Sequence, residues 1–301
     1  MSRSLAIMAS IAFTATLAAC GGSDPLEEGG ETTQPDSEST TLSIGSQDYY
    51  SNEIIAEIYA QALEAEGYTI NRDFRIGSRE VYMPELETGS IDVLPEYTGN
   101  FLQYFAPDTE AKSPEDVYGE LDGALPDGLR VLDQAPATDQ DSYVVLSSFA
   151  DEHDLVSIGD LSGIDGLTLG GNSELEVRPY GPEGLQEIYG VDVEFTPIED
   201  SGGPLTIKAL RDGEVELVNI FTASPVLAGD EFTVLEDPEA MFLASHVVPV
   251  VSDRVDDAAA AIINDISAKL TSDELVALNQ RSVDDQASAA ELASDWLSEN
   301  S

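Results

Sequence analysis

The sequence has little of the chemistry on which most enzymes depend. Its 301 residues include one cysteine, Cys20, and two histidines, His153 and His246. One cysteine excludes an internal disulfide framework and a thiol metal site, and neither histidine has a partner at the spacing of a zinc site. The chain has no G-x-S-x-G elbow, phosphate-binding loop or G-x-G-x-x-G followed by a helix. We therefore expect no enzyme activity, no cofactor and no metal.

Positive charge is also scarce. The chain has 12 lysines and arginines against 59 acidic residues, a net charge of −47, and its only lysines are Lys112, Lys208 and Lys269. Phosphate backbones would repel such a surface, so nucleic acid is not an expected partner. A lysine-poor acidic surface stays hydrated in strong salt, where charge repulsion is screened. This composition favours a salt-tolerant organism, and a high-GC genome that simply favours Asp and Glu is the alternative.

Long hydrophobic runs are absent except for a short one at the start. Arg3, the apolar run LAIMASIAFTATLA and then LAAC, which ends at Cys20, have the layout of a secretory signal. The run is shorter than the ~20 apolar residues of a membrane span. The small residues before Cys20 resemble the lipobox of bacterial lipoproteins, which would place a lipid on Cys20. An ordinary signal peptide with a leftover cysteine is the alternative.

Residues 21–40 contain mainly Gly, Pro, Ser, Thr and acidic residues, with almost nothing to bury. Such a composition is typical of a flexible tether. We expect residues 1–20 to be a signal peptide and residues 21–40 to tether the remaining chain. The mature protein would then be an extracytoplasmic monomer, anchored to the cell membrane as a lipoprotein.

Strand and helix patterns alternate from residue 41 onward. TLSIG at 41–45 is a β-branched apolar strand, and apolar residues recur at helical spacing after it, with Ser51 as the expected N-cap and Gly67 as the stop. A strand near 74–77, a helix near 82–86 and a strand at 91–94 follow. This order predicts an α/β fold with a mainly parallel sheet flanked by helices.

Part of this plan occurs twice. LSIGSQ at 42–47 matches LTLGGN at 167–172, EIYA at 57–60 matches EIYG at 187–190, and LETGSIDVLPEYT at 86–98 matches LRDGEVELVNIFT at 210–222. Three matches in the same order at nearly one offset indicate an internal repeat. The sequence therefore predicts two similar α/β lobes.

The end of the chain has helical patterns at 256–270, 271–280 and 287–300, with no counterpart after the first lobe. Thr271 and Glu274 have the spacing of a capping box, and Trp296 is expected in a core. We expect these helices to pack back onto the first lobe. Lobe 1 would then comprise residues 41–141 and 250–301, and lobe 2 residues 142–249.

Polar and aromatic residues end the matching strands. Ligands of open α/β sheets bind beyond the carboxyl ends of the strands. If the lobes face each other, one cleft would be lined by Gln47, Tyr97, Thr98, Asn172, Phe221 and Thr222. The alternative is that Tyr97 and Phe221 each fill the sheet of their own lobe. An aromatic cleft suits a quaternary ammonium, which has no N–H to donate but is attracted to ring faces.

Several segments, taken in order, resemble one family: IGSQ before a helix, DVLPEYTGN, DSYVV, ELEVRPYGPEGL, KALRDGEVELVNIFT and HVVPVV. They are similar to the substrate-binding proteins of ABC importers for glycine betaine, choline and related osmoprotectants, from about residue 41 to 300. The resemblance implies a type II periplasmic-binding-protein-like fold, in which two lobes joined by a hinge close on the ligand.

The resemblance also implies where the cationic end of a ligand would bind. Tyrosines line that end in the family, and Tyr97 and Tyr143 match them, with Asp141 beside the latter. The alternatives are that Tyr143 is a core residue of a hinge strand and that Asp141 belongs to a turn. Phe221 stands where a tyrosine is usual and keeps only the ring. A further family tyrosine is replaced here by Ser245 or His246. The cage is therefore thinner than usual.

The same resemblance implies a site for a ligand carboxylate. Arg178 matches the family arginine, which can bind a carboxylate through two hydrogen bonds, and a surface salt bridge to one of the many acids is the alternative. Gln47 ends the first strand, where the family has Lys or Gln, and Asn100 replaces a common threonine. This end of the site is less positive than usual.

These features predict a solute-binding protein that delivers a quaternary-ammonium compatible solute to the permease of an ABC importer. Glycine betaine is the first choice, because a ligand with both an onium group and a carboxylate would use the rings and Arg178. Proline betaine, carnitine, choline, ectoine or an amino acid are the alternatives. A surface adhesion protein is a further alternative for a tethered chain.

Overall fold

The computed structural model describes residues 41–300, so the expected signal peptide, the tether and Cys20 lie outside the described residues. The described chain belongs to one unit, residues 39–301. Within residues 41–300, none of the helices combines the length and the apolar character needed to cross a membrane.

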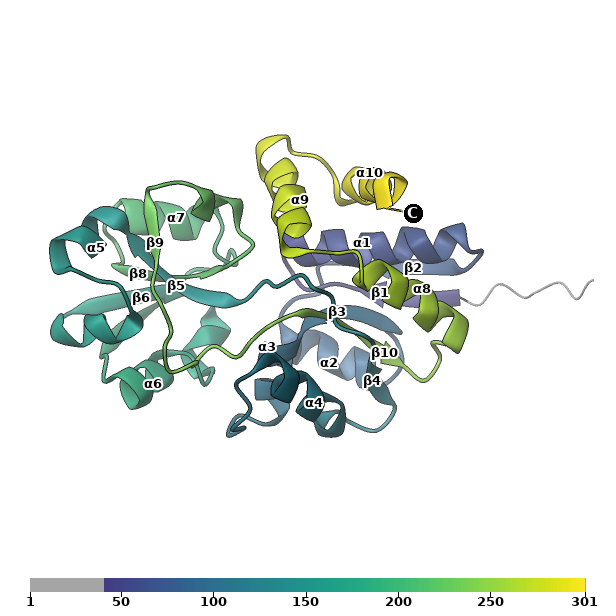
Figure 1. The fold of residues 1–301 in the computed structure, drawn as a ribbon, viewed down its shortest axis with the longest axis horizontal. Helices are drawn as coiled ribbons and strands as arrows, with labels where there is room; N and C mark the ends of the chain where they lie inside the picture. The colour runs from purple at the N-terminus through teal and green to yellow at the C-terminus, as the bar shows by residue number, and fades with distance from the viewer. Residues whose placement is uncertain (1–40, 301) are drawn as a thin grey trace, which may run out of the picture. The chain divides into compact units, whose positions relative to one another are not determined.

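The first lobe is built on a five-stranded sheet in the order β2-β1-β3-β10-β4 (Figure 1). β1 pairs in parallel with β2 and β3, whereas β10 runs antiparallel to β3 and β4, so four strands share one direction. Its strands are β1 (Thr41–Gly45), β2 (Thr69–Asp73), β3 (Val93–Tyr97), β4 (Leu129–Val131) and β10 (Val247–Ser252). Its helices are α1 (Tyr50–Ala65), α2 (Arg79–Glu87), α3 (Thr98–Phe105) and α4 (Pro114–Ala124), with α8 (Asp257–Ser267), α9 (Ser272–Asp284) and α10 (Ala289–Asn300) at the end of the chain.

The second lobe repeats this layout with the sheet order β7-β6-β8-β5-β9. β6 pairs in parallel with β7 and β8, and β5 runs antiparallel to β8 and β9. The strands are β5 (Asp141–Leu146), β6 (Leu167–Gly171), β7 (Val193–Pro197), β8 (Leu217–Phe221) and β9 (Phe232–Val234). Helices α5 (Ser147–His153), α6 (Pro182–Gly184) and α7 (Pro204–Arg211) accompany them, together with short turns η1 (Ile158–Gly163), η2 (Ser173–Val177), η3 (Leu185–Tyr189) and η4 (Pro225–Ala228).

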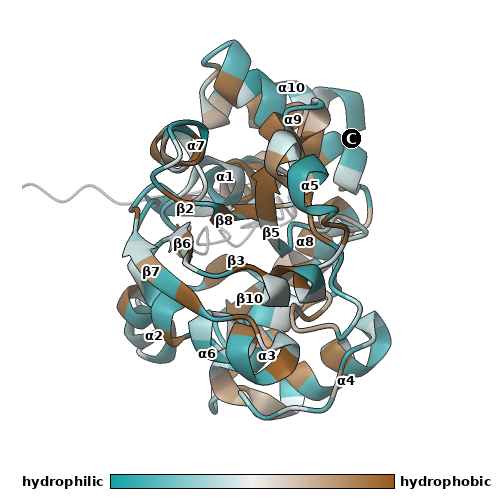
Figure 2. Cartoon of the chain, turned by 90° about the vertical axis from the view of Figure 1, so that its left-hand side faces the viewer, coloured by the Kyte–Doolittle hydropathy of each residue, from teal (hydrophilic) through white to brown (hydrophobic). Residues whose placement is uncertain are grey.

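The two sheets therefore correspond strand for strand, with β1 matching β6, β3 matching β8 and β10 matching β5. The expected two-lobed α/β fold is confirmed. Figure 2 shows a hydrophobic stretch in β5, which ends with Val144, Val145 and Leu146, while the helices carry hydrophilic stretches. This is the pattern of a sheet covered by amphipathic helices.

The chain passes between the lobes along two segments, residues 132–140 and 235–246, which cross near the centre of Figure 1. The segments pair with each other through a bridge between Thr138 and His246. The Ala135 amide also donates to the Val247 carbonyl at 2.8 Å. The predicted lobe boundaries fall at the start of β5 and inside β10, and these boundaries stay a prediction.

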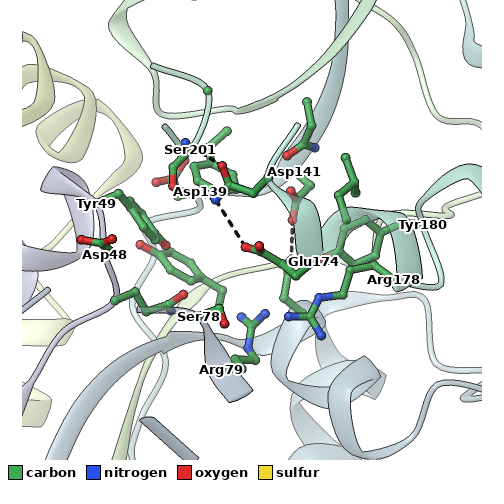
Figure 3. Close-up of a pocket in the computed structure, with 18 of the residues that line it drawn as sticks. Asp48, Tyr49, Ser78, Arg79, Asp139, Asp141, Glu174, Arg178, Tyr180 and Ser201 are labelled. Carbon is green, nitrogen blue, oxygen red and sulfur yellow. Dashed lines mark hydrogen bonds between the residues drawn. The ribbon is translucent and has the colours of Figure 1, made fainter. Parts of the chain in front are cut away.

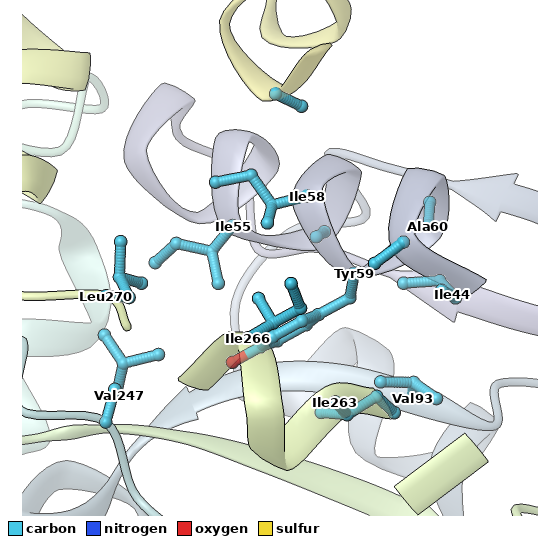
Figure 4. Close-up of a cluster of buried hydrophobic side chains, with 14 of the residues drawn as sticks. Ile44, Ile55, Ile58, Tyr59, Ala60, Val93, Val247, Ile263, Ile266 and Leu270 are labelled. Atoms are coloured by element: carbon cyan, nitrogen blue, oxygen red, sulfur yellow. The ribbon is translucent and has the colours of Figure 1, made fainter. Parts of the chain in front are cut away.

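Helices α8, α9 and α10 pack on the first lobe, as expected. Ile263, Leu275 and Leu292 from these helices share one buried cluster with Ile55 and Tyr59 of α1, and Figure 4 shows part of this cluster between α1 and α8. Trp296 is 5% exposed in the same cluster. The capping box of Thr271 and Glu274 is present at the start of α9.

Two local expectations are wrong. The strand placed near residues 74–77 is instead β2, Thr69–Asp73, a mostly exposed edge strand that pairs with β1. Ser51 does not cap α1, because the N-cap is Tyr49 and the Ser51 hydroxyl donates to Asp139 at 3.1 Å. Both errors have the same cause. Contacts with residues far away in the sequence determine the bounds of β2 and the role of Ser51, and the local sequence pattern contains no information about such contacts.

Candidate ligand-binding site

A cavity of about 80 Å³ lies between the lobes, at the carboxyl ends of the matching strands (Figure 3). Its walls come from both lobes and from the first connecting segment. Seven of the ten residues predicted to bind ligand line it, namely Gln47, Tyr97, Asn100, Asp141, Asn172, Arg178 and Phe221. The strand ends meet because each sheet places its β1-type and β3-type strands side by side in parallel.

An aromatic cluster occupies one side of the cavity. The Tyr49 ring lies with its centroid 6.4 Å from that of Tyr97 in the first lobe, nearly parallel to it, and 5.1 Å from that of Phe221 in the second lobe. The rings that end β3 and β8 therefore meet through Tyr49. Burial, followed by the nearby Tyr97 and Asp139, raises the pKa of Tyr49 well above its usual value, so its phenol stays neutral.

Two buried carboxylates line the cavity beside these rings. Asp139 is 5% exposed and accepts hydrogen bonds from the Ser51 hydroxyl at 3.1 Å and the Ala223 amide at 2.8 Å. Burial raises the pKa of Asp139 to about 7. Asp141 is equally buried and accepts a hydrogen bond from Asn100, and burial raises its pKa too. Neither carboxylate forms an ion pair within the described chain.

Two guanidinium groups lie side by side at the opposite side of the cavity in Figure 3. Arg79 donates from Nε and Nη2 to the two carboxylate oxygens of Glu96, both at 2.8 Å, and this pair is buried. Arg178 binds Glu80 in the same two-point manner, at 2.8 and 3.3 Å, and so links the second lobe to α2. Each cation in the cavity wall is therefore already neutralised by a carboxylate.

The amide side chains of the site are also bonded within the protein. Gln47 donates to Glu96 at 3.3 Å. Asn100 donates to Asp141 and to the Tyr180 hydroxyl, and its own oxygen accepts from Ser245 at 2.7 Å. Asn172 donates to the Ser201 hydroxyl at 3.0 Å and to Glu174 at 3.3 Å.

The structure does not bring Thr98, Tyr143 and Thr222 to the cavity wall. Tyr143 is fully buried in the second lobe, and its hydroxyl donates to the Tyr180 carbonyl at 2.5 Å. Thr98 donates to the Ala244 carbonyl and accepts from the His246 amide, both at 3.0 Å. Ser245 and His246 are likewise absent from the wall.

Thr222 acts on the other connecting segment, because its hydroxyl accepts from the Gln140 amide at 2.9 Å and its own amide donates to the Gln140 carbonyl at 2.8 Å. The two residues of the repeated aromatic–threonine pair thus have different structural roles. The ring faces the cavity, and the threonine next to it fastens one connecting segment. The two side chains differ in this way because successive residues of a strand point to opposite faces.

Sequence reasoning missed several residues of the wall, including Tyr49, Arg79, Asp139 and Tyr180. Tyr49 follows the first strand closely, so the rule that ligands bind at strand ends could have found it. Tyr180 lies two residues after Arg178 in the same loop. Arg79 and Asp139 have no such signal, since only the tertiary fold brings α2 and the connecting segment to the cavity.

Comparisons with known proteins identify the class. A solved structure of a glycine betaine/carnitine/choline ABC transporter protein has a TM-score of 0.68 at 19% identity, over 86% of this chain and 98% of that chain. A choline-binding protein of an ABC transporter, solved with choline, has a TM-score of 0.62 at 15% identity, over 86% and 88% of the chains. These likenesses show that the chain has the same two-lobed α/β fold.

The family follows from the sequence. The model of the OpuAC family, the substrate-binding domain of the ABC-type glycine betaine transport system, matches residues 40–299. The chain belongs to this family. It is also similar to the glycine-betaine-binding protein of Pseudomonas aeruginosa, at 25% identity over 86% of this chain and 88% of that protein. The family comprises extracytoplasmic substrate-binding proteins of transporters and not enzymes.

Proposed function

We propose that the chain binds a quaternary-ammonium compatible solute in the cavity between its lobes and delivers it to the permease of an ABC importer. The observation that carries this proposal is the cluster of Tyr49, Tyr97 and Phe221, in which rings from both lobes share one cavity. Glycine betaine is the first candidate that the family description suggests. Choline, proline betaine, carnitine, ectoine or an amino acid are the alternatives.

The physical reason is the electrostatics of an onium group. A trimethylammonium cannot donate an N–H bond, whereas each desolvated ring face attracts it by roughly 0.5–2 kcal/mol. The buried carboxylate of Asp139 next to the rings adds Coulomb attraction. A ligand that touches the rings of both lobes would favour the closed arrangement through a hinge motion of the two connecting segments.

The proposal assigns ligand contact to Gln47, Tyr97, Asn100, Asp141, Asn172, Arg178 and Phe221, together with Tyr49, Asp139 and Tyr180. Thr98, Tyr143 and Thr222 would act from behind the wall. We also propose that a lipid on Cys20 anchors the protein outside the membrane. Recovery of the protein in the soluble fraction of lysed cells would contradict the anchor without affecting the binding proposal.

The test is a thermal-shift screen of the purified protein with betaines, choline, carnitine, ectoine, amino acids and sugars, followed by titration calorimetry of each hit. We expect a quaternary-ammonium compound to give the largest shift, because a ligand that binds only the folded state stabilises it by mass action. A sugar or peptide as the best ligand would refute the proposed substrate class. No shift with any small solute would favour the adhesion alternative.

A further inference from the structure

The side chains expected to hold a ligand carboxylate already hold carboxylates of the protein. Arg178 binds Glu80 through both carboxylate oxygens. Gln47 donates to Glu96, and Asn100 donates to Asp141. Each of the three donors is thus directed to an internal acceptor that carries or can carry a negative charge.

Arg79, the second guanidinium group in the cavity wall, is also not free to bind a ligand carboxylate. Arg79 makes two hydrogen bonds of 2.8 Å to Glu96, which is fully buried. A buried, two-point ion pair of this kind is costly to break, because removal of one partner leaves the other charge without compensation. Arg79 is therefore committed to Glu96.

The wall has more acidic than basic side chains. Four carboxylates line the cavity, those of Asp48, Asp139, Asp141 and Glu174, and none of them forms an ion pair in the described chain. The two guanidinium groups of the wall are balanced by Glu80 and Glu96, which do not line it. In Figure 3 the Glu174 side chain extends into the cavity from the second lobe.

From this arrangement we infer that the preferred ligand is a monocation, with a quaternary ammonium at one end and an uncharged hydrogen-bonding group at the other, and not a zwitterion. The inference rests on the proposed function and reverses the order of its first two candidates. A ligand carboxylate would face four acidic side chains that form no ion pair, and would have to displace Glu80 from Arg178. A hydroxyl instead donates a hydrogen bond to a carboxylate such as Asp141.

Choline and glycine betaine form a matched pair of probes, since both carry a trimethylammonium group and they differ mainly in a hydroxymethyl group against a carboxylate. Titration calorimetry of the purified protein at one pH and one ionic strength gives the two dissociation constants. We expect choline to bind roughly tenfold or more tighter than glycine betaine, a difference of ~1.4 kcal/mol. Equal affinities, or tighter binding of betaine or carnitine, would overturn the inference and leave the proposed function standing, whereas ectoine as the tightest ligand would overturn both. If none of these compounds binds and a sugar or peptide does, both fall.

A variant tests the cause of the preference. Glu80→Gln removes the carboxylate that neutralises Arg178, and Glu80 does not line the cavity. We expect this change to strengthen betaine binding by roughly threefold or more and to leave choline binding within about threefold, because only betaine offers Arg178 a new anionic partner. Glu85→Gln, on an exposed face of the same helix, is the matched control for loss of one charge. An unchanged affinity ratio in Glu80→Gln would contradict the role given to this ion pair.

Discussion

At the scale of single residues, the aromatic cluster shows what the sequence could and could not reveal. Tyr97 and Phe221 were predicted because the repeat places them at equivalent strand ends, and both line the cavity. Tyr49, whose ring contacts both of them, has no repeated partner in the sequence and is missed by sequence reasoning. Tyr143 was included through the family resemblance, but it lies behind Tyr180. A repeat therefore finds shared positions and overlooks the residues that make the two lobes different.

The first prediction concerns the ring of Tyr97. We expect Tyr97→Ala to weaken binding of the best quaternary-ammonium ligand by roughly tenfold or more, since the change removes one cation–π partner and its contact area. Titration calorimetry measures the loss. Tyr68→Ala is the control, because Tyr68 lies on the first lobe outside the cavity wall and bonds Asp256 at 3.0 Å. Unchanged affinity in Tyr97→Ala, with a normally folded variant, would refute the aromatic site.

The second prediction concerns the proton on Asp139. Burial raises the pKa of Asp139 to about 7, with Asp141 adding a smaller contribution in the same direction. The other titratable groups that interact with Asp139 are Tyr49, Tyr50 and Tyr97, whose raised pKa values keep them neutral. A bound cation favours the ionised form and lowers the pKa of Asp139, so the complex holds fewer protons than the free protein.

Affinity for the cation should therefore rise with pH through the region near 7 and level off above it. Below that region we expect it to fall by up to roughly tenfold per pH unit until the pKa of the complex is reached. Calorimetry at pH 6, 7 and 8 tests the slope. In Asp139→Asn the carboxylate is absent, so binding should be weaker and nearly independent of pH over this range. A wild-type affinity that falls with rising pH would contradict the prediction.

At the scale of elements, the two lobes could be predicted from the sequence. The antiparallel strands and the hydrogen bonds that hold the connecting segments could not. Periodicity and the repeat indicated the strands β1, β3, β6 and β8 and the three terminal helices, because these depend on local pattern and burial. In the cited pairs, the antiparallel strands β5 and β10 pair with residues about 75–160 positions away, which no local pattern records. The same applies to the threonines that fasten the connecting segments.

The third prediction tests the hydrogen bonds by which Thr98 holds one connecting segment. Thr98 is fully buried, and its hydroxyl serves the Ala244 carbonyl and the His246 amide. Thr98→Val keeps the shape of the side chain but leaves both backbone groups without this partner, which should lower the free energy of unfolding by ~1–3 kcal/mol. Urea denaturation measures the change. Thr88→Val, at an exposed position where the hydroxyl bonds the Pro84 carbonyl, should cost less than about 0.5 kcal/mol. Equal losses in the two variants would show that Thr98 has no special role.

At the scale of the whole molecule, the acidic surface dominates the electrostatics. Of the 59 acidic residues, six lie in residues 1–40, and nine of the other 53 form ion pairs. Eight of the eleven described lysines and arginines are used in those pairs, and Lys112, Arg130 and Lys269 donate to backbone carbonyls. The described chain therefore has 44 carboxylates that form no ion pair, and their mutual repulsion favours expansion of the chain.

Salt should relieve this repulsion and stabilise the protein. The screening length falls from about 10 Å at 0.1 M to about 3 Å at 1 M ionic strength, shorter than most separations between surface carboxylates. We expect the melting temperature at pH 7 to rise by roughly 3 °C or more between 0.1 and 1 M KCl, about 1 kcal/mol for a chain of this size. Salt also strengthens apolar burial, so the same series is measured near the isoelectric point of about 4.1, where the net charge is small. Screening predicts a large rise at pH 7 and little near pH 4, whereas a general salting-out effect predicts similar rises at both. A melting temperature that falls with KCl at pH 7 would remove the physical basis for reading the acidic surface as an adaptation to salt.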